Sequence, residues 1–173
     1  MALSMGLIAV VTFVLVGMYG GVSFSPGGPS DGQVVTADVA GGLEKAPPLV
    51  GFPVVIPSDL PADWTPNSFS FTEKPGSPAQ PPAARAGWLT DAGRFITLIQ
   101  SSGTATDVLI AEIGAAGPPK GTETVSGAEW TVTTGRRTEQ AWFRTVDGIT
   151  YLITGSASPE DFRVLAGAAA MTP

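Results

Sequence analysis

The chain has 173 residues, of which 43% are hydrophobic and only 14% are charged, and its formal net charge is −6. This length is enough for one domain plus an appendage, and the acidic balance is unlike the basic footprint of a nucleic-acid-binding protein. The sequence contains no Cys and no His, which excludes disulfides, thiol nucleophiles and Ser-His-Asp chemistry and removes the usual zinc ligands. We therefore expect a non-enzymatic protein with no metal, no cofactor and no nucleic-acid partner.

The first thirty residues carry no charged side chain, and Ala2–Val22 is almost entirely apolar. A helix of about 20 apolar residues matches the thickness of a bilayer's hydrocarbon core, and this run is longer than the apolar part of a secretory signal peptide. The sequence therefore predicts an uncleaved signal anchor over residues 1–24, with residues 2–22 in the lipid. No Lys or Arg precedes this segment, so charge does not set its orientation; we expect the rest of the chain to lie outside the cytoplasm.

Residues 25–48 are rich in Gly, Pro, Ser and Asp, which predicts a flexible linker before a folded domain over residues 49–173. The stretch "VGFPVVIPSDLPADWTPNSFSFT" predicts a short apolar strand, a Pro-bounded turn and a second strand with Phe69 and Phe71 on one face. Trp64, between these strands, has two interpretations. It is either a binding aromatic or, as is more common for such a residue, a Trp folded against the edge of the sheet.

Two stretches that start 54 residues apart follow the same plan: "GWLTDAGRFITLIQSSGTATD" from Gly87 and "AWFRTVDGITYLITGSASPED" from Ala141. Each reads as a hairpin followed by a helix, with turn residues that favour tight β-turns and a Ser or Thr cap before the helix. At this offset, identical residues are paired as follows: Trp88 and Trp142, Leu98 and Leu152, Ile99 and Ile153, Ser102 and Ser156, Asp107 and Asp161. The caps Thr104 and Ser158 also coincide. We interpret the two stretches as a structural repeat.

These elements predict an α+β domain in which an antiparallel sheet is packed by two helices. We expect both helices to cover the same face of the sheet, since antiparallel sheets commonly leave one face in water. The residues expected in the core are Trp88, Phe95, Val108, Trp142, Ile149 and Phe162.

Few residues are candidates for a functional site. Arg136 and Arg137 form the only adjacent basic pair and could hold a phosphate or carboxylate, although a solvated turn is the more common role. Together with Trp64 they are the candidate partner or anion contacts. Asp59 and Asp63 are interpreted as turn formers, and no catalytic, cofactor-binding or metal-binding residue is predicted.

Five stretches together resemble a known family: "VGFPVVIPSDLPADW", "SFSFT", "GWLTDAGRFITLIQ", "AEWTVTTG" and "ITYLITGSASPEDFRVLAGA". They are similar to an actinobacterial family of single-pass membrane proteins from mycobacteria and their relatives, known only as a domain of unknown function. The resemblance covers essentially the whole chain. Members usually carry a short basic segment before the membrane helix, and this sequence has none. The resemblance implies a cell-envelope setting and assigns no catalytic or ligand-binding residue.

We therefore expect a membrane-anchored, extracytoplasmic accessory or binding protein of the cell envelope that associates with a membrane or envelope protein complex. The first alternative is a carrier of a small ligand or lipid, with a pocket between sheet and helices. A second alternative is a hydrolase that uses Ser or Asp without His, which would need a perturbed pKa in a cleft. A large apolar cavity would favour the carrier, and a filled core would count against it.

Overall fold

The computed structural model describes residues 36–77, 79–115, 117–135 and 139–170. The chain divides into two units, Met1–Gln33 and Val34–Pro173, and only the second is described below. The predicted membrane anchor over residues 1–24 and the first part of the predicted linker lie outside the described residues. Among the helices of the described part, none is long and apolar enough to cross a bilayer.

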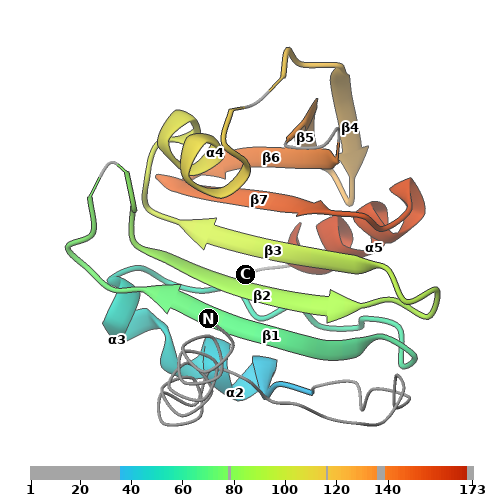
Figure 1. Cartoon of the computed structure of the whole chain (residues 1–173), viewed down its shortest axis with the longest axis horizontal. Helices are drawn as coiled ribbons and strands as arrows, with labels where there is room; N and C mark the ends of the chain where they lie inside the picture. Colours follow the sequence, from blue (N-terminus) through green and yellow to red (C-terminus); the bar gives the residue numbers. More distant parts are fainter. Residues whose placement is uncertain (1–35, 78, 116, 136–138, 171–173) are drawn as a thin grey trace, which may run out of the picture. The chain divides into compact units, whose positions relative to one another are not determined.

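Within the described residues, seven strands form one antiparallel sheet in the order β1-β2-β3-β7-β6-β5-β4 (Figure 1). The first three strands are β1 (Thr65–Thr72), β2 (Ala83–Leu89) and β3 (Phe95–Ser101), and the last four are β4 (Gly121–Val125), β5 (Ala128–Thr134), β6 (Gln140–Val146) and β7 (Ile149–Gly155). Consecutive strands are joined by hairpins except where helix α4 (Ala105–Ile113) intervenes between β3 and β4. The predicted antiparallel α+β architecture is therefore confirmed.

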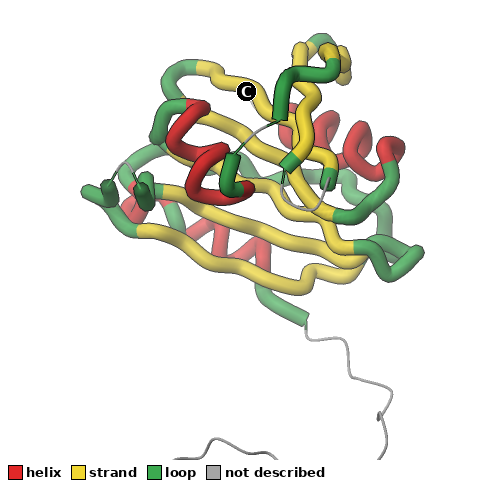
Figure 2. The backbone as a smooth tube through the Cα atoms, turned by 45° about the horizontal axis from the view of Figure 1, so that its top comes forward, coloured by secondary structure: helices red, strands yellow, loops and turns green. Residues whose placement is uncertain are grey.

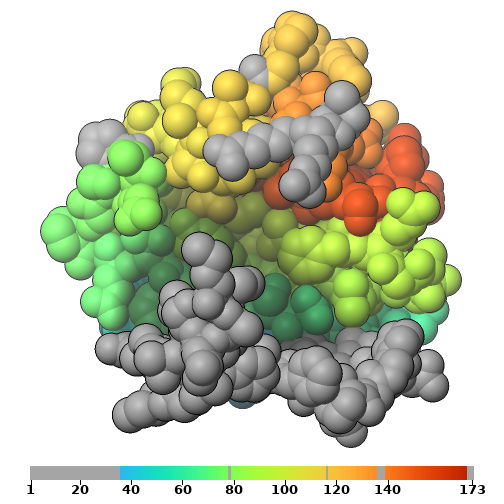
Figure 3. Space-filling model, viewed as in Figure 1, coloured from blue at the N-terminus to red at the C-terminus, as the bar shows by residue number. Residues whose placement is uncertain are grey.

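Helices lie on both sides of this sheet (Figure 2). Helices α2 (Val39–Lys45), α3 (Pro47–Val50) and α5 (Pro159–Ala170) belong with the larger hydrophobic cluster, which holds Trp88, Trp142 and Phe162. Helix α4 covers the opposite face, over the smaller cluster around Ile99, Val108 and Leu152. In the space-filling view of that face, the yellow side chains of α4 stand beside the orange ones of β6 (Figure 3).

The predicted turns and helix caps are confirmed. Gly93 in the β2–β3 turn and Asp147-Gly148 in the β6–β7 turn all have positive φ, the conformation that these tight turns require. The Thr104 hydroxyl accepts a hydrogen bond from the backbone N–H of Asp107 and donates one to its carboxylate. Ser158 and Asp161 make the same pair of bonds at the start of α5, so local sequence sets where both helices begin.

The flexible linker predicted for residues 25–48 is wrong from Val39 onward. Asp38 caps α2 by accepting a hydrogen bond from the N–H of Gly41, and Leu43 is fully buried. Gly42 suggested a linker because Gly is a poor helix former. Here it allows close packing, since a Cβ at Gly42 would lie 2.5 Å from the ring of Phe69 on β1.

The repeat is confirmed in element order, but the prediction that both helices cover one face is wrong. Strands β3 and β7 are antiparallel neighbours, in which Leu98 pairs with Ile153 and Ile99 pairs with Leu152. Cross-strand partners share a face, so Leu98 and its repeat equivalent Leu152 point to opposite faces. The helices that follow these strands also lie on opposite faces, α4 with the smaller hydrophobic cluster and α5 with the larger one.

Two residues expected in the core are less buried than predicted. Phe95 is 37% exposed because it lies on the face of α4, four residues along β3 from Ile99, where its ring lies against Gly87 rather than under a helix. Ile149 is half-buried at the β6–β7 turn. The apolar strand predicted near Val55 is also wrong, because residues 53–58 form an irregular segment. Strand β4, which is polar, was not predicted.

Candidate functional site

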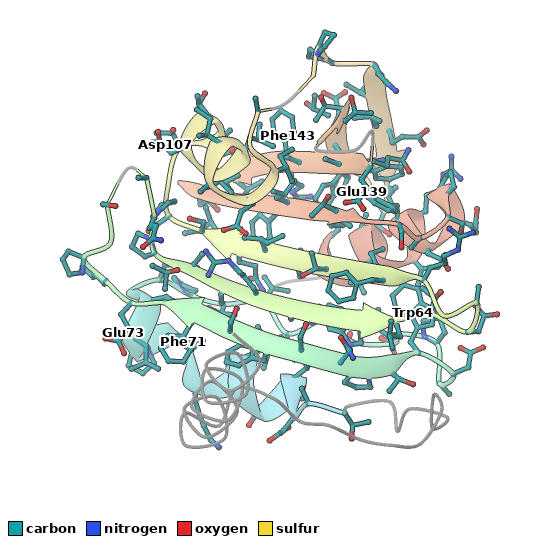
Figure 4. The ribbon with its side chains drawn as sticks, in the orientation of Figure 1. Trp64, Phe71, Glu73, Asp107, Glu139 and Phe143 are labelled. Atoms are coloured by element: carbon teal, nitrogen blue, oxygen red, sulfur yellow. The ribbon has the colours of Figure 1, made fainter. Side chains whose placement is uncertain are left out.

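Of the three predicted contact residues, Trp64 is the one that the structure describes. Trp64 is only 7% exposed and belongs to the larger hydrophobic cluster, so the interpretation as a Trp folded against the sheet is the one that holds. It lies just before β1, at the opposite end of that strand from Phe71 (Figure 4). Arg136 and Arg137 lie outside the described residues.

The structure instead points to Arg144, which the sequence analysis did not single out. Arg144 on β6 pairs directly with Tyr151 on β7, so their side chains share the face that also carries α5. The guanidinium carbon lies 5.5 Å from the ring centroid of Trp130 on β5 and 5.7 Å from that of Tyr151. Both distances are within the range of a cation–π interaction, so two aromatic rings on flanking strands hold this cation.

The guanidinium of Arg144 has no acidic partner in the described part of the chain. There, Arg85 donates to Glu112, and Arg163 donates to Glu123 and Glu160. No described carboxylate lies within 4.0 Å of Arg144, and no described acceptor takes a hydrogen bond from it. Its N–H donors are therefore left for water or for a bound anion.

Arg144 also lines a surface pocket of about 340 Å³ on the face of the sheet that carries α5. The wall comes from three places: the irregular segment 53–55, the end of the β6–β7 hairpin, and the last residues of α5. The lining residues are Pro53, Val54, Val55, Arg144, Val146, Asp147, Ile149, Tyr151, Ala169 and Ala170. Seven of these ten residues are apolar, and the other three supply one cation, one carboxylate and one phenol, a mixture that ligand sites commonly have.

A second depression meets the first at Arg144. It lies where β5 leaves β6, since the pairing of these strands ends at Thr131 and Phe143. Its lining includes Gly127, Glu129 and Thr145. Divergence of the two strands thus leaves Arg144 accessible from two sides.

One wall of the pocket is fixed by Gln100, a fully buried residue on β3. Its side-chain oxygen accepts a hydrogen bond of 2.7 Å from the N–H of Val55, and its side-chain nitrogen donates one of 2.7 Å to the carbonyl oxygen of Val55. These bonds satisfy both backbone groups of a residue that has no strand partner. The pocket wall is therefore held in place without a regular element.

The phenol of Tyr151 stays protonated over a wide pH range. Burial raises the pKa of Tyr151 above its ordinary value of 10.0; nearby Arg144 opposes this shift and Asp147 adds to it. At neutral pH Tyr151 is thus a neutral O–H group beside a cation.

In the described residues, no group of three or more acidic side chains is placed to hold a metal ion.

Part of this site could have been found from the sequence. A two-residue Asp-Gly turn fixes the register of the hairpin, and this register places Arg144 opposite Tyr151. The contribution of Trp130 could not have been found in this way, because β5 and β6 are joined through residues 135–139 and their divergence is not encoded locally.

The fold and the site define an α+β domain with a surface pocket of mixed polarity that contains one arginine. The chain belongs to the family described as "Protein of unknown function (DUF4245)", whose model matches residues 1–169. The resemblance drawn from the sequence is thus confirmed at the level of a domain of unknown function. No curated protein and no solved structure matches the chain.

Proposed function

We propose that this protein is a non-catalytic binding domain of the cell envelope, anchored in the membrane by residues 2–22 as a single-pass protein, with its folded domain outside the cytoplasm. In this proposal it is an accessory component of a membrane or envelope protein complex. The tether supports the proposal, because a short chain keeps a small domain within tens of ångströms of the bilayer. The resemblance to actinobacterial single-pass proteins supports it too.

The observation that carries the binding role is Arg144, held between Trp130 and Tyr151 with no carboxylate partner among the described residues. Positioning a charged side chain by two aromatic rings limits its conformational freedom, which lowers the entropic cost of binding. Arg and aromatic residues are also the types that dominate binding energy at protein interfaces.

The alternative of a lipid or small-ligand carrier has one observation in its favour, the pocket of about 340 Å³ between the sheet and the end of α5. The interior between the sheet and α5 is filled by Trp130, Trp142 and Phe162, each at most 1% exposed. A carrier that encloses its cargo needs an internal cavity, so we place this alternative second.

Affinity purification of the tagged full chain in mild detergent tests the proposal. We expect stoichiometric recovery of a membrane or envelope protein with the wild type, and reduced recovery with Arg144→Met. Arg94→Met, in the exposed β2–β3 turn, is the matched control and should behave as the wild type does. Recovery of the protein alone, carrying a bound lipid, would overturn the accessory role in favour of the carrier.

A further inference from the structure

The free donors of Arg144 lie at the edge of its guanidinium plane. The cation–π contacts with Trp130 and Tyr151 take no hydrogen bond from these donors, and the five N–H groups point outward within the plane. This edge matches the two oxygens of a carboxylate or phosphate, which it can bind through two parallel hydrogen bonds. The cation is therefore arranged to recognise an anion, and no described carboxylate lies within 4.0 Å of it.

The apolar side chains of the pocket favour a ligand with an apolar body. Val54, Val55, Val146 and Ile149 line it together with the last residues of α5. Its volume of about 340 Å³ is near the lower end of the roughly 300–1,000 Å³ that ligand pockets span. These dimensions suit a small molecule rather than a long lipid chain.

Asp147 limits the charge of the ligand. Its carboxylate lines the same pocket and acts electrostatically on Tyr151, as Arg144 does. A phosphate monoester carries a charge of about −1.5 to −2 near neutral pH, so its second charge would be repelled by Asp147. A carboxylate carries a single charge, which Arg144 can balance.

We propose that the Arg144 pocket binds a small organic molecule with one carboxylate on an apolar body. The carboxylate accepts hydrogen bonds from the guanidinium edge, and the apolar body lies against Val54, Val55 and Ile149. This inference rests on the proposed binding function, for which it names the chemical class of a ligand. It holds whichever envelope protein is the partner.

Titration calorimetry on the full chain in phosphatidylcholine nanodiscs tests this proposal, with empty nanodiscs as the blank. The probes are 4-phenylbutyrate, its neutral amide, acetate and phenyl phosphate. We expect 4-phenylbutyrate to bind about tenfold or more tightly than the amide, because hydrogen bonds to a charged group are the stronger ones. Acetate, which lacks the apolar body, and phenyl phosphate, which carries the second charge, should bind more weakly than 4-phenylbutyrate.

Two substitutions should act in opposite directions. Arg144→Met should abolish the preference for the acid over the amide, and Arg144→Lys should retain only part of it, since an ammonium lacks the planar fork. Asp147→Asn should tighten binding of 4-phenylbutyrate severalfold. It should tighten binding of phenyl phosphate more, so that the ratio of the two affinities becomes smaller. Arg94→Met is again the control and should change nothing.

Equal affinities for acid and amide, no detectable binding of 4-phenylbutyrate, or an unchanged preference in Arg144→Met would each overturn the proposed site. Weaker binding in Asp147→Asn would overturn the charge argument. If Arg144→Met fails to fold, the other two variants still test the site. An acid-over-amide preference that is unchanged in Arg144→Lys, or binding of 4-phenylbutyrate that is not tightened in Asp147→Asn, would then overturn the proposal. If the wild-type chain co-purifies a partner but does not bind 4-phenylbutyrate, the ligand class alone is refuted. If it binds 4-phenylbutyrate but co-purifies no partner, the accessory role alone is refuted.

Discussion

Gln100 shows how a single side chain takes the place of a strand. Its amide exchanges with Val55 the two hydrogen bonds that a neighbouring strand would supply, and it does so while fully buried. Buried backbone groups must be paired, so segment 53–58 stays against the sheet because of this contact. The shape of the proposed ligand pocket follows from it, since Pro53, Val54 and Val55 form one wall.

Replacing Gln100 with Leu should destabilise the domain by about 1–3 kcal/mol for each Val55 group left buried without a partner. Unfolding in urea, followed by tryptophan fluorescence, measures this loss. All four tryptophans report on the domain, since each is at most 7% exposed: Trp64, Trp88, Trp130 and Trp142. Gln80→Leu, in an exposed loop, is the control and should change the free energy of unfolding by no more than about 0.5 kcal/mol. Equal effects of the two substitutions would contradict this role.

Tyr151 should make the stability of the domain pH-dependent in the alkaline range. Its pKa is higher in the folded than in the unfolded chain, because burial and Asp147 disfavour the phenolate more than Arg144 favours it. The folded state therefore holds this proton more tightly, and its contribution to stability is complete below pH 10 and lost as the pH rises through the folded-state pKa.

Urea midpoints measured by circular dichroism from about pH 8 to about pH 11 test this effect. The midpoint of the wild type should fall more steeply above about pH 10 than that of Tyr151→Phe, which has no proton to lose. Comparison of the two proteins cancels the titration of the lysines. Parallel curves would show that Tyr151 has the same pKa in both states.

At the scale of elements, α4 depends on a partly buried ion pair. Arg85 on β2 donates to both carboxylate oxygens of Glu112 on α4, the shortest contact being 2.6 Å, and also to the hydroxyl of Thr72. The two charged side chains are 24% and 14% exposed. The pair thus ties α4 to the face of the sheet that no other described helix covers.

Glu112→Gln should lower the free energy of unfolding by about 1.5–3 kcal/mol, because it weakens charged hydrogen bonds that are largely removed from water. Glu123→Gln is the matched control, because it breaks the ion pair between Glu123 and Arg163 on α5. The Arg163 side chain is 42% exposed and the Glu123 side chain is 37% exposed. Solvent screens such a pair, so the free energy of unfolding should change little. Urea unfolding compares the two variants. A loss from Glu123→Gln as large as that from Glu112→Gln would contradict the difference in burial.

At the scale of the whole domain, the residues before Leu49 complete the core. The N–H of Ala37 donates a hydrogen bond to the carbonyl oxygen of Pro66 at the start of β1. Val39 and Leu43 on α2 are buried in the larger hydrophobic cluster, and Gly42 lies against Phe69. β1 is an edge strand of the sheet. Helix α2 packs on its face and covers Phe69, which would face water without this helix.

A chain that begins at Leu49 should be far less stable than one that begins at Val34. Val39 and Leu43 each contribute about 1.5–3 kcal/mol through burial, and a domain of this size has a total stability of only about 5–15 kcal/mol. We expect the shorter chain to unfold at much lower urea or to aggregate through exposed Phe69. Equal urea midpoints for the two chains would show that α2 is dispensable.

The sequence by itself determined the features that depend on a few neighbouring residues. Asp147-Gly148 specified a tight hairpin, and the pairs Thr104 with Asp107 and Ser158 with Asp161 specified the starts of two helices. These signals are reliable because steric limits on φ and hydrogen bonds across one turn act over about four residues. Side chains alternate along a strand, so Tyr151 and Leu152 lie on opposite faces of the sheet.

The tertiary structure decided which face each element covers. Leu98 and Leu152 are equivalent in sequence but lie on opposite faces of the sheet, since Leu98 on β3 is paired with Ile153, the residue that follows Leu152 on β7. Helix α2 forms despite two glycines because burial of Val39 and Leu43 outweighs propensity. The site around Arg144 requires Trp130 from a third strand and Val55 from a distant segment. Burial depends on residues far apart in the chain, and no local pattern specifies it.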